Sequence, residues 1–299
     1  MPEPHTTAVQ RITARKGHLG EGMDIARALP TKQRRMIGAW CFLDHLGPIE
    51  FAPGMGMHVG AHPHTRLQTF TWMIEGEILH RDSLGSEQVL RAGQVNLMTA
   101  GYGISHTEDS VRDGERLHAA QLWIALPDAV ADQPPSFVHH AQVPQWQSQG
   151  CQWSLMAGHY AGHQAPAQLH SPLLGLEVCT PAAAGDAATA PVTLALQPDF
   201  EYGLLALTGS FALEDEHFPQ DELAYLAPGR TALQLQLQPG TRLLVIGGAP
   251  FTEPVVMWWN FLGQDLARIR GYAAQWQAQD ARFGCVPGGA DRLQAPPLP

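Results

Sequence analysis

The chain has 299 residues, of which 44% are hydrophobic and 15% charged, a composition that indicates a globular protein and excludes a disordered one. This length predicts two domains of about 150 residues each. The formal net charge of −10 argues against a nucleic-acid-binding surface, because no stripe of Lys and Arg is available to replace phosphate counterions. Apolar runs fall short of the roughly 18 residues that a membrane helix needs, so we expect no membrane contact.

The beginning of the chain and its cysteines both indicate a reducing compartment. Residues 1–5 read MPEPH and lack the apolar core of a signal peptide, so the expected location is the cytoplasm. The four cysteines, at positions 41, 151, 179 and 285, form no CxxC and no close pair, and are expected to be small buried side chains. A thiolate zinc site is therefore not expected, and any metal must be held by His and carboxylate groups.

The first half of the chain reads as short strands joined by turns, because its breaks fall at residues that tolerate unusual φ values. Strands are expected over residues 68–80, 88–90, 94–98, 117–125 and 151–157. Residues 127–144 read as an irregular excursion between two of these strands.

The second half contains a β-rich run that resembles part of the first half. Residues 180–191, TPAAAGDAATAP, read as a linker, and the β-rich run follows over residues 192–248. Within it, residues 203–215 echo residues 71–82, since both are apolar strands broken by a central Gly and closed by a charged turn. This internal repeat predicts two related β-barrels.

Only the tail shows a convincing helical pattern. Over residues 265–279, the apolar side chains recur three and four positions apart, at Leu266, Ile269, Ala273 and Trp276. This spacing predicts a helix with one apolar face, which we expect to pack on a barrel.

Two short segments carry candidate metal ligands. His62-Pro63-His64 is followed, within the same β-rich run, by His106-Thr107-Glu108. Residues i and i+2 of a strand lie on one face, so each triplet places two ligating groups on one side of a sheet. Pro63 cannot donate to a strand ladder, which predicts that the first pair lies near a strand edge or bend.

Three imidazoles and one carboxylate are a donor set that suits Fe(II), Mn(II), Ni(II) or Cu(II) better than structural zinc. Four ligands in an octahedron leave two positions for substrate, water or dioxygen, which is typical of a catalytic or sensing site. One HxH triplet alone is common by chance, but the second pair at hairpin distance favours a metal site. His58 and His80 could line the mouth of the site, but a solvated or core position is favoured for both.

These segments resemble the two motifs of the cupin superfamily and, more closely, the metal-site segment of the pirin family. The resemblance is carried by HPHTRLQTFTWMIEGEILHRDSLG from His62 and by AGQVNLMTAGYGISHTE, which ends at Glu108. It is supported by FLDHLGP at residues 42–48 and by EPVVMWWNF at residues 253–261.

The resemblance implies an all-β bicupin of two antiparallel jelly-roll barrels with a C-terminal α-helix. Residues 1–170 would form the metal-binding barrel, and residues 171–299 would form a metal-free barrel together with the helix. The ligands carried over are His62, His64, His106 and Glu108, around one divalent metal. Fe(II) is expected, with Mn, Ni, Cu or Zn as alternatives.

The sequence departs from the family pattern at one position near this site. The family commonly has Glu four residues beyond the second motif His, where this chain has Gln68. Gln keeps the hydrogen-bonding shape but carries no charge and cannot act as a base.

Several pirin-like proteins are similar to quercetin 2,3-dioxygenases, which cleave the central ring of flavonols with O2 and release carbon monoxide. For such a flavonol-like substrate, Glu108 would be the catalytic group that accepts the proton of the 3-hydroxyl. The candidates for apolar pocket walls are Phe70, Trp72, Met73 and Met98, although strand alternation would place about half of them in the ordinary core. The alternative implied by the resemblance is an iron-dependent regulator that binds a protein partner. A third alternative is another small-molecule role, since cupins host many reactions.

Overall fold

The structure, a computed structural model, describes residues 8–19, 23–112, 114–182, 191–288 and 291–298. Its internal contacts separate two units whose segments alternate along the chain. The first unit comprises residues 16–25, 43–142 and 252–299, and the second comprises residues 1–15, 26–42 and 143–251.

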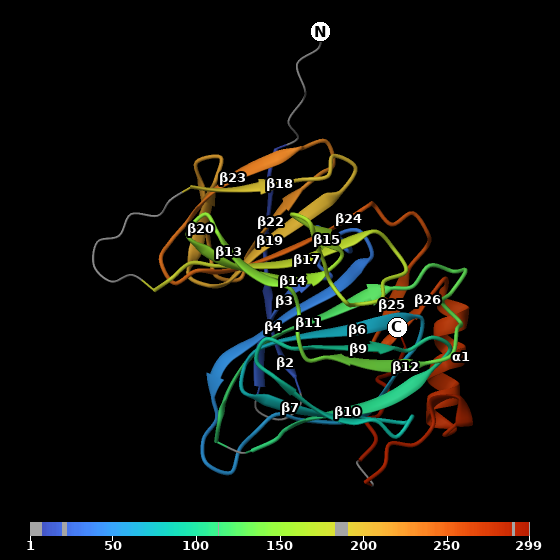
Figure 1. Ribbon diagram of the computed structural model, residues 1–299. Helices are drawn as coiled ribbons and strands as arrows, with labels where there is room; N and C mark the ends of the chain where they lie inside the picture. Colours follow the sequence, from blue (N-terminus) through green and yellow to red (C-terminus); the bar gives the residue numbers. More distant parts are fainter. Residues whose placement is uncertain (1–7, 20–22, 113, 183–190, 289–290, 299) are drawn as a thin grey trace. The chain divides into compact units, whose positions relative to one another are not determined.

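The first unit is a sandwich of two antiparallel sheets with a short hairpin and a helix (Figure 1). The larger sheet has the order β12-β9-β6-β11-β4-β3-β2. Its strands are β2 (Arg15–Leu19), β3 (Met23–Leu29), β4 (Trp40–Glu50), β6 (Leu67–Glu75), β9 (Val95–Thr99), β11 (Arg116–Ala125) and β12 (Ser136–His140). The smaller sheet has the order β5-β10-β7-β8, from β5 (His58–His64), β7 (Glu77–Asp82), β8 (Glu87–Arg91) and β10 (Ile104–Ser110).

The second unit repeats this plan. Its larger sheet has the order β1-β22-β19-β24-β17-β14-β13 and its smaller sheet the order β18-β23-β20-β21. The larger sheet contains β1 (Gln10–Thr13), β13 (Gln145–Ser148), β14 (Cys151–Ala157), β17 (Leu173–Cys179), β19 (Glu201–Thr208), β22 (Glu222–Leu226) and β24 (Arg242–Gly248). The smaller contains β18 (Pro191–Ala195), β20 (Ser210–Leu213), β21 (Glu216–Pro219) and β23 (Ala232–Leu237), and β15 (His159–Tyr160) pairs with β16 (His163–Gln164).

The predicted internal repeat is confirmed strand by strand. β6 and β19 each occupy the third position of a seven-stranded sheet, and β7 and β20 each occupy the third position of a four-stranded sheet. A glycine with positive φ joins the two strands in each unit. Gly76, with φ of 88°, joins β6 to β7, and Gly209, with φ of 72°, joins β19 to β20. A Cβ on Gly76 would lie 2.2 Å from the backbone oxygen of Arg116, so this turn requires glycine.

The fold is therefore the expected all-β bicupin with a C-terminal helix, although its sheets face one another as jelly-roll-like sandwiches and do not close into barrels. The core of the first unit is apolar and includes Met57, Val59, Met73 and Leu90. The expected division at residue 170 falls inside the second unit, and residues 252–299 group with the first unit. That the chain forms two independent domains stays a prediction, and most of the predicted linker over 180–191 lies outside the described residues.

The predicted helix is α1 (Leu266–Gln277), which lies beside β25 (Val256–Trp258) and β26 (Phe261–Gly263) (Figure 1). Its buried face carries Ile269, Tyr272, Ala273 and Trp276, whereas Leu266 is 49% exposed and does not belong to it. A short 3-10 turn (Ala281–Phe283) follows. No helix in the described part of the chain is both long and apolar enough to cross a membrane.

The N-terminal cap of α1 contributes to the stability of the helix, and this contribution can be tested. The Asp265 side chain accepts a hydrogen bond of 2.8 Å from the Arg268 backbone N–H and so caps the helix. Replacing Asp265 by Ala is expected to lower the free energy of unfolding by about 1 kcal/mol, measured by chemical denaturation. Arg270→Ala, at an exposed position inside the same helix, is the matched control and should leave that free energy nearly unchanged. Equal stabilities for the two variants would contradict the capping role.

Candidate metal centre

Strands β5 and β10 pair antiparallel and bring the two predicted triplets together. His106 lies opposite His62, and Ile104 lies opposite His64. Because alternate residues of a strand share a face, the side chains of His62, His64 and His106 all lie on the same side of the smaller sheet. The predicted convergence of these three imidazoles is therefore found in the structure.

The three rings meet closely in the interior of the first unit. One ring nitrogen from each of His62, His64 and His106 lies within 4.8 Å of the other two. The Nε2 atoms of His64 and His106 are 3.1 Å apart, and the ring centroids of His62 and His106 are 4.3 Å apart. All three side chains are buried.

Backbone carbonyl groups orient two of the rings. The Nδ1–H of His62 donates to the carbonyl oxygen of Gly60 at 2.9 Å, and the Nδ1–H of His64 donates to that of Asn260 at 3.1 Å. A carbonyl oxygen can only accept, so in both rings the proton is on Nδ1 and the lone pair is on Nε2. These lone pairs are therefore available to a metal ion.

Burial keeps the imidazoles unprotonated. It lowers the pKa of His62 to about 4 and holds the pKa values of His64 and His106 well below the ordinary value. The neighbouring imidazoles lower these pKa values further because two positive charges cannot lie so close together. At neutral pH the three rings are neutral, which is the state that ligates metals.

Glu108 lies on the same face of β10 as His106 but is not part of the group of three nitrogens. A shift in the register with β5 between His106 and Glu108 places Glu108 opposite Val59 of β5, and on the other side it lies opposite His80 of β7. Glu108 is 8% exposed, and the burial of its carboxyl, with a smaller effect of Asp109, raises the pKa to about 7. Its assignment as a ligand stays a prediction.

The donor set fits a transition-metal ion. Two nitrogen ligands at right angles, each about 2.1 Å from a metal, lie about 3.0 Å apart, close to the 3.1 Å between Nε2 of His64 and of His106. A cation between these nitrogens relieves the repulsion between lone pairs that face each other. Neutral imidazole ligands suit Fe, Ni, Cu and Zn, so the rings alone do not select one metal.

The larger sheet faces this site with aromatic rings. Phe137 of β12 stacks on His80 with a centroid distance of 4.3 Å, and Trp123 of β11 meets the edge of His64 at 5.0 Å. Met98 of β9 pairs with Phe137, and Thr69 of β6 pairs with both Met98 and Trp123, so Met98 and Thr69 lie between the two aromatic residues across the sheet.

Of the predicted pocket walls, Met98 therefore lies on the face of the sheet that meets the histidines. Met73 lies on this face of β6 too but packs in the apolar core. Phe70 and Trp72 lie on the opposite face of β6, so they are the candidates that alternation, as expected for about half of the four, removes from the pocket wall. The same alternation places Gln68 on that opposite face, where its amide donates to Thr99 Oγ1 at 3.0 Å.

Strand β5 is an edge strand of the smaller sheet, which confirms the position predicted from Pro63. Its outer edge meets two C-terminal segments, since Leu262 N–H donates to the carbonyl of Thr65 and Leu293 N–H donates to that of Ala61. The carbonyl that holds His64 comes from this C-terminal region, at Asn260. The sequence offered no signal for it, because any residue can supply a backbone carbonyl.

The two remaining histidines of this region differ from one another. His58 is exposed and pairs with Asp109 at 3.1 Å, which agrees with the predicted solvated role. His80 is 3% exposed, and its Nδ1 lies 3.3 Å from Nδ1 of His106. His80 is therefore a buried neighbour of the site, and the same i, i+2 pattern, in His80-Arg81-Asp82, could have identified it.

The corresponding strands of the second unit carry aliphatic side chains at these positions. β18 and β23 occupy the places of β5 and β10 in the sheet order. Their buried, cross-strand neighbours are Val192 with Leu235 and Leu194 with Leu233. These side chains belong to the apolar core of the second unit.

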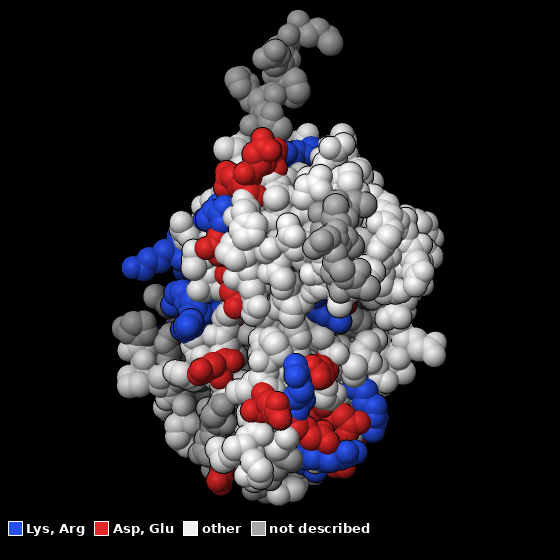
Figure 2. Space-filling view, turned by 90° about the vertical axis from the view of Figure 1, so that its left-hand side faces the viewer, with Lys and Arg blue, Asp and Glu red and all other residues white. Residues whose placement is uncertain are grey.

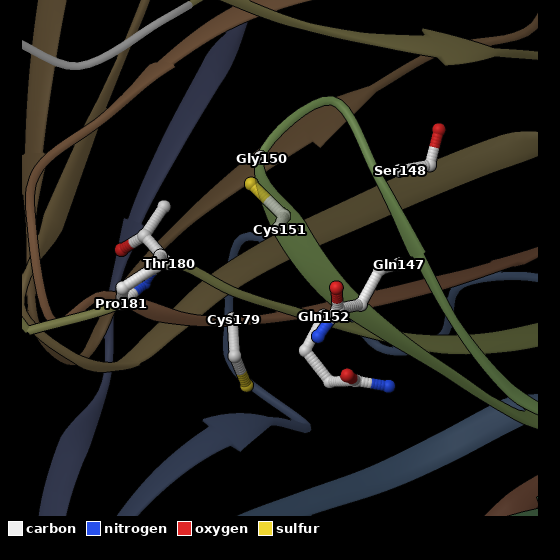
Figure 3. A pocket seen from close by; sticks show the side chains of 8 residues that line it. All are labelled: Gln147, Ser148, Gly150, Cys151, Gln152, Cys179, Thr180 and Pro181. Atoms are coloured by element: carbon white, nitrogen blue, oxygen red, sulfur yellow. The ribbon is translucent and has the colours of Figure 1, made fainter.

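A surface pocket of about 430 Å³ lies in the second unit and contains two cysteines (Figure 3). Burial raises the pKa of Cys151, and burial together with Glu177 raises that of Cys179, so both stay thiols. Their side chains point away from each other in Figure 3. A protonated thiol is a poor nucleophile and a poor metal ligand, so this pocket is a weaker candidate for chemistry than the histidine site.

The all-β bicupin architecture with three converging imidazoles defines a cupin-type protein with a candidate metal site. Sequence comparison names the family: residues 22–124 match the model of Pirin, and residues 187–284 match that of the Pirin C-terminal cupin domain. The chain belongs to the pirin family.

Individual relatives agree with this assignment. A Pseudomonas aeruginosa protein with the provisional name quercetin 2,3-dioxygenase is 55% identical over all of this chain and 93% of its own length. A pirin-like protein of Caulobacter vibrioides is 35% identical, over 89% of this chain and 91% of its own. The crystal structure of a quercetin 2,3-dioxygenase from Acinetobacter baumannii superposes with a TM-score of 0.93 at 42% identity, covering 97% of this chain and 96% of that one.

Proposed function

We propose that this pirin-family chain is a metal-dependent dioxygenase that acts on flavonols such as quercetin with O2. In this proposal His62, His64, His106 and Glu108 hold one divalent metal, Fe(II) before Mn, Ni, Cu or Zn. The observation that carries the proposal is the convergence of three neutral imidazoles, two of them oriented by backbone carbonyls. The 55% identity to a protein named as a quercetin 2,3-dioxygenase supports the substrate class.

The bound metal would supply a Lewis-acid position that lowers the pKa of the flavonol 3-hydroxyl. Glu108 accepts the proton of that hydroxyl, and its position beside His106 on the inner face of β10 supports this role. A carboxyl whose pKa lies at about 7 exchanges protons readily at neutral pH. His62 and Glu108 are 6% and 8% exposed, against 1% for His64 and His106, so substrate approaches from their side.

The opposite wall suits a flat aromatic substrate. Phe137, Met98 and Trp123 present two rings and a thioether from the sheet that faces the histidines. Such side chains bind aromatic ligands by stacking and by removing apolar surface from water. O2 then adds across the substrate's central ring, which opens with loss of carbon monoxide.

We propose that the reaction takes place in the cytoplasm and that the protein contacts neither a membrane nor a nucleic acid. In the described part of the chain no disulfide joins Cys41, Cys151, Cys179 or Cys285, as is usual for proteins of a reducing compartment. The face in Figure 2 carries acidic and basic side chains in mixed clusters, and the formal charge is −10. Both features support a small-molecule substrate over a polyanion.

Turnover of quercetin by the metal-loaded chain tests the proposal. The protein is loaded anaerobically with Fe(II), mixed with quercetin and O2, and followed by the flavonol absorbance band, O2 uptake and carbon monoxide release. We expect the flavonol band to disappear with equimolar O2 uptake in the metal-loaded protein. Without metal we expect neither loss of the band nor O2 uptake. If protein loaded with Fe, Mn, Ni, Cu or Zn leaves quercetin intact, the enzymatic proposal is wrong. The alternative, a metal-dependent regulator that binds a protein partner, then gains support.

A further inference from the structure

A chain of three buried side chains leads away from the metal site through β7. Nδ1 of His106 lies 3.3 Å from Nδ1 of His80, and Nε2 of His80 lies 3.1 Å from Oδ2 of Asp82. His106, His80 and Asp82 are all at most 3% exposed. Neither His80 nor Asp82 has a part in the proposed reaction.

Asp82 is held at both oxygens. Its Oδ1 accepts hydrogen bonds from the backbone N–H groups of Leu84, at 2.9 Å, and Ser86, at 3.0 Å. This leaves Oδ2 directed at His80. Burial favours the neutral carboxyl, but the hydrogen bonds from His80 and Ser86 outweigh it and lower the pKa of Asp82, so the group is a carboxylate at neutral pH.

When the His80 ring carries one proton, this carboxylate sets the directions of the hydrogen bonds between Asp82 and His80 and between His80 and His106. A carboxylate only accepts, so His80 carries a proton on Nε2, and Nδ1 of a neutral His80 must accept. His106 therefore donates from Nδ1 to His80. Its remaining lone pair is on Nε2, the atom that lies 3.1 Å from Nε2 of His64.

His106 differs in this respect from the other two imidazoles. The Nδ1 atoms of His62 and His64 face carbonyl oxygens, which admit one tautomer. Nδ1 of His106 faces a ring nitrogen, which can either donate or accept. Only the carboxylate at the end of the chain decides between the two. The stacking of His80 on Phe137, with ring planes 9° apart, holds the intermediate ring in place.

We propose that Asp82 and His80 are positioning residues that fix the tautomer and orientation of His106 and thereby strengthen metal binding. The inference rests on the metal site proposed above, whatever reaction the metal serves. Outer partners of this kind typically contribute about 10- to 100-fold to metal affinity.

Asp82→Asn tests the direction of the chain with little change in shape. The new amide oxygen can still accept from Leu84 and Ser86, which directs the amide N–H at Nε2 of His80. His80 must then protonate on Nδ1, opposite the Nδ1–H of His106, and two donors face each other. We expect affinity for Ni(II), measured by calorimetry on the full chain, to fall about 10- to 100-fold.

The matched control is Asp24→Asn. Asp24 also pairs with a histidine, His18, at 2.7 Å, but both side chains are more than 80% exposed. This variant should bind Ni(II) as the wild type does. Equal affinities for Asp82→Asn and the wild type would overturn the inference.

Ring tautomers give a readout that a merely structural role would not change. In Zn(II)-loaded protein, long-range 1H–15N spectra should place the proton of His80 on Nε2 in the wild type and on Nδ1 in Asp82→Asn. If affinity falls while the proton of His80 stays on Nε2, Asp82 acts through folding alone and the inference is wrong.

His80 provides a second pair of variants in case Asp82→Asn fails to fold. His80→Asn keeps an acceptor near the position of Nδ1, whereas His80→Leu removes it. We expect His80→Asn to retain most of the Ni(II) affinity and His80→Leu to lose about 10- to 100-fold. Equal affinities in the two variants would overturn the inference. A wild type that binds no metal would instead contradict the proposed site itself.

Discussion

His106→Ala is expected to abolish metal binding and, with it, any metal-dependent turnover. His106 is the ring that links the others, with its Nε2 3.1 Å from that of His64 and its centroid 4.3 Å from that of His62. Loss of an outer partner alone costs about 10- to 100-fold in metal affinity, so removal of a ligand is expected to cost more than about 100-fold. Calorimetric titration with Ni(II) or Co(II) measures this loss.

His58→Ala is the matched control for this experiment. His58 lies on β5 with His62 and His64, but it is exposed and pairs with Asp109 outside the cluster. The His58→Ala variant should leave metal affinity and quercetin turnover unchanged. Stoichiometric binding by His106→Ala, or an equal loss in both variants, would contradict the assignment of the three imidazoles.

Glu108→Gln is expected to weaken metal binding and at the same time to stabilise the metal-free protein. The pKa of Glu108 is raised from 4.5 to about 7 in the folded chain, so the folded state holds the proton more tightly than the unfolded state does. Its contribution is therefore favourable at low pH and is lost as the pH rises through about 7. A difference of this size corresponds to about 3 kcal/mol above pH 7.

The pH dependence separates the Glu108 effect from other consequences of the substitution. Glutamine has no ionisable proton, so metal-free Glu108→Gln should be more stable than the wild type at pH 8 by up to about 3 kcal/mol, and by little near pH 4.5. Urea denaturation at several pH values measures this, with the exposed Glu87→Gln as control. A stability difference that does not change with pH would contradict the buried carboxyl, and wild-type metal affinity would exclude Glu108 as a ligand.

The part of the site that the sequence could predict depends on strand periodicity. His62, His64 and His106 converge because i and i+2 positions share a face, and the rule holds wherever the ladder is regular. At Glu108 the side chain keeps the face of His106, but a shift in the register with β5 places this residue opposite Val59, outside the regular ladder. A bulge of this kind depends on how two strands pair and leaves no mark in a three-residue motif such as His106-Thr107-Glu108.

Other features could not be predicted because a local sequence pattern does not indicate which side chains of a strand or helix meet the site or the core. Phe70 and Trp72 alternate with Thr69 and Thr71 on a strand buried on both faces, so composition did not indicate which side meets the metal. Leu266 fits the helical period, but it falls in the first turn, beyond the reach of the core. His80 and Asp82 show the i, i+2 signal as clearly as the ligands, and only the structure reveals that they meet His106.

Metal stoichiometry after anaerobic reconstitution tests the central claim most directly. The wild-type chain is incubated with Fe(II), and in parallel with Mn, Co, Ni, Cu and Zn, and the unbound metal is removed before elemental analysis. We predict about one tightly bound ion per chain for at least Fe(II), and none retained by His106→Ala. Absence of stoichiometric binding for every one of these metals, in folded wild-type protein, would contradict the assignment of this site.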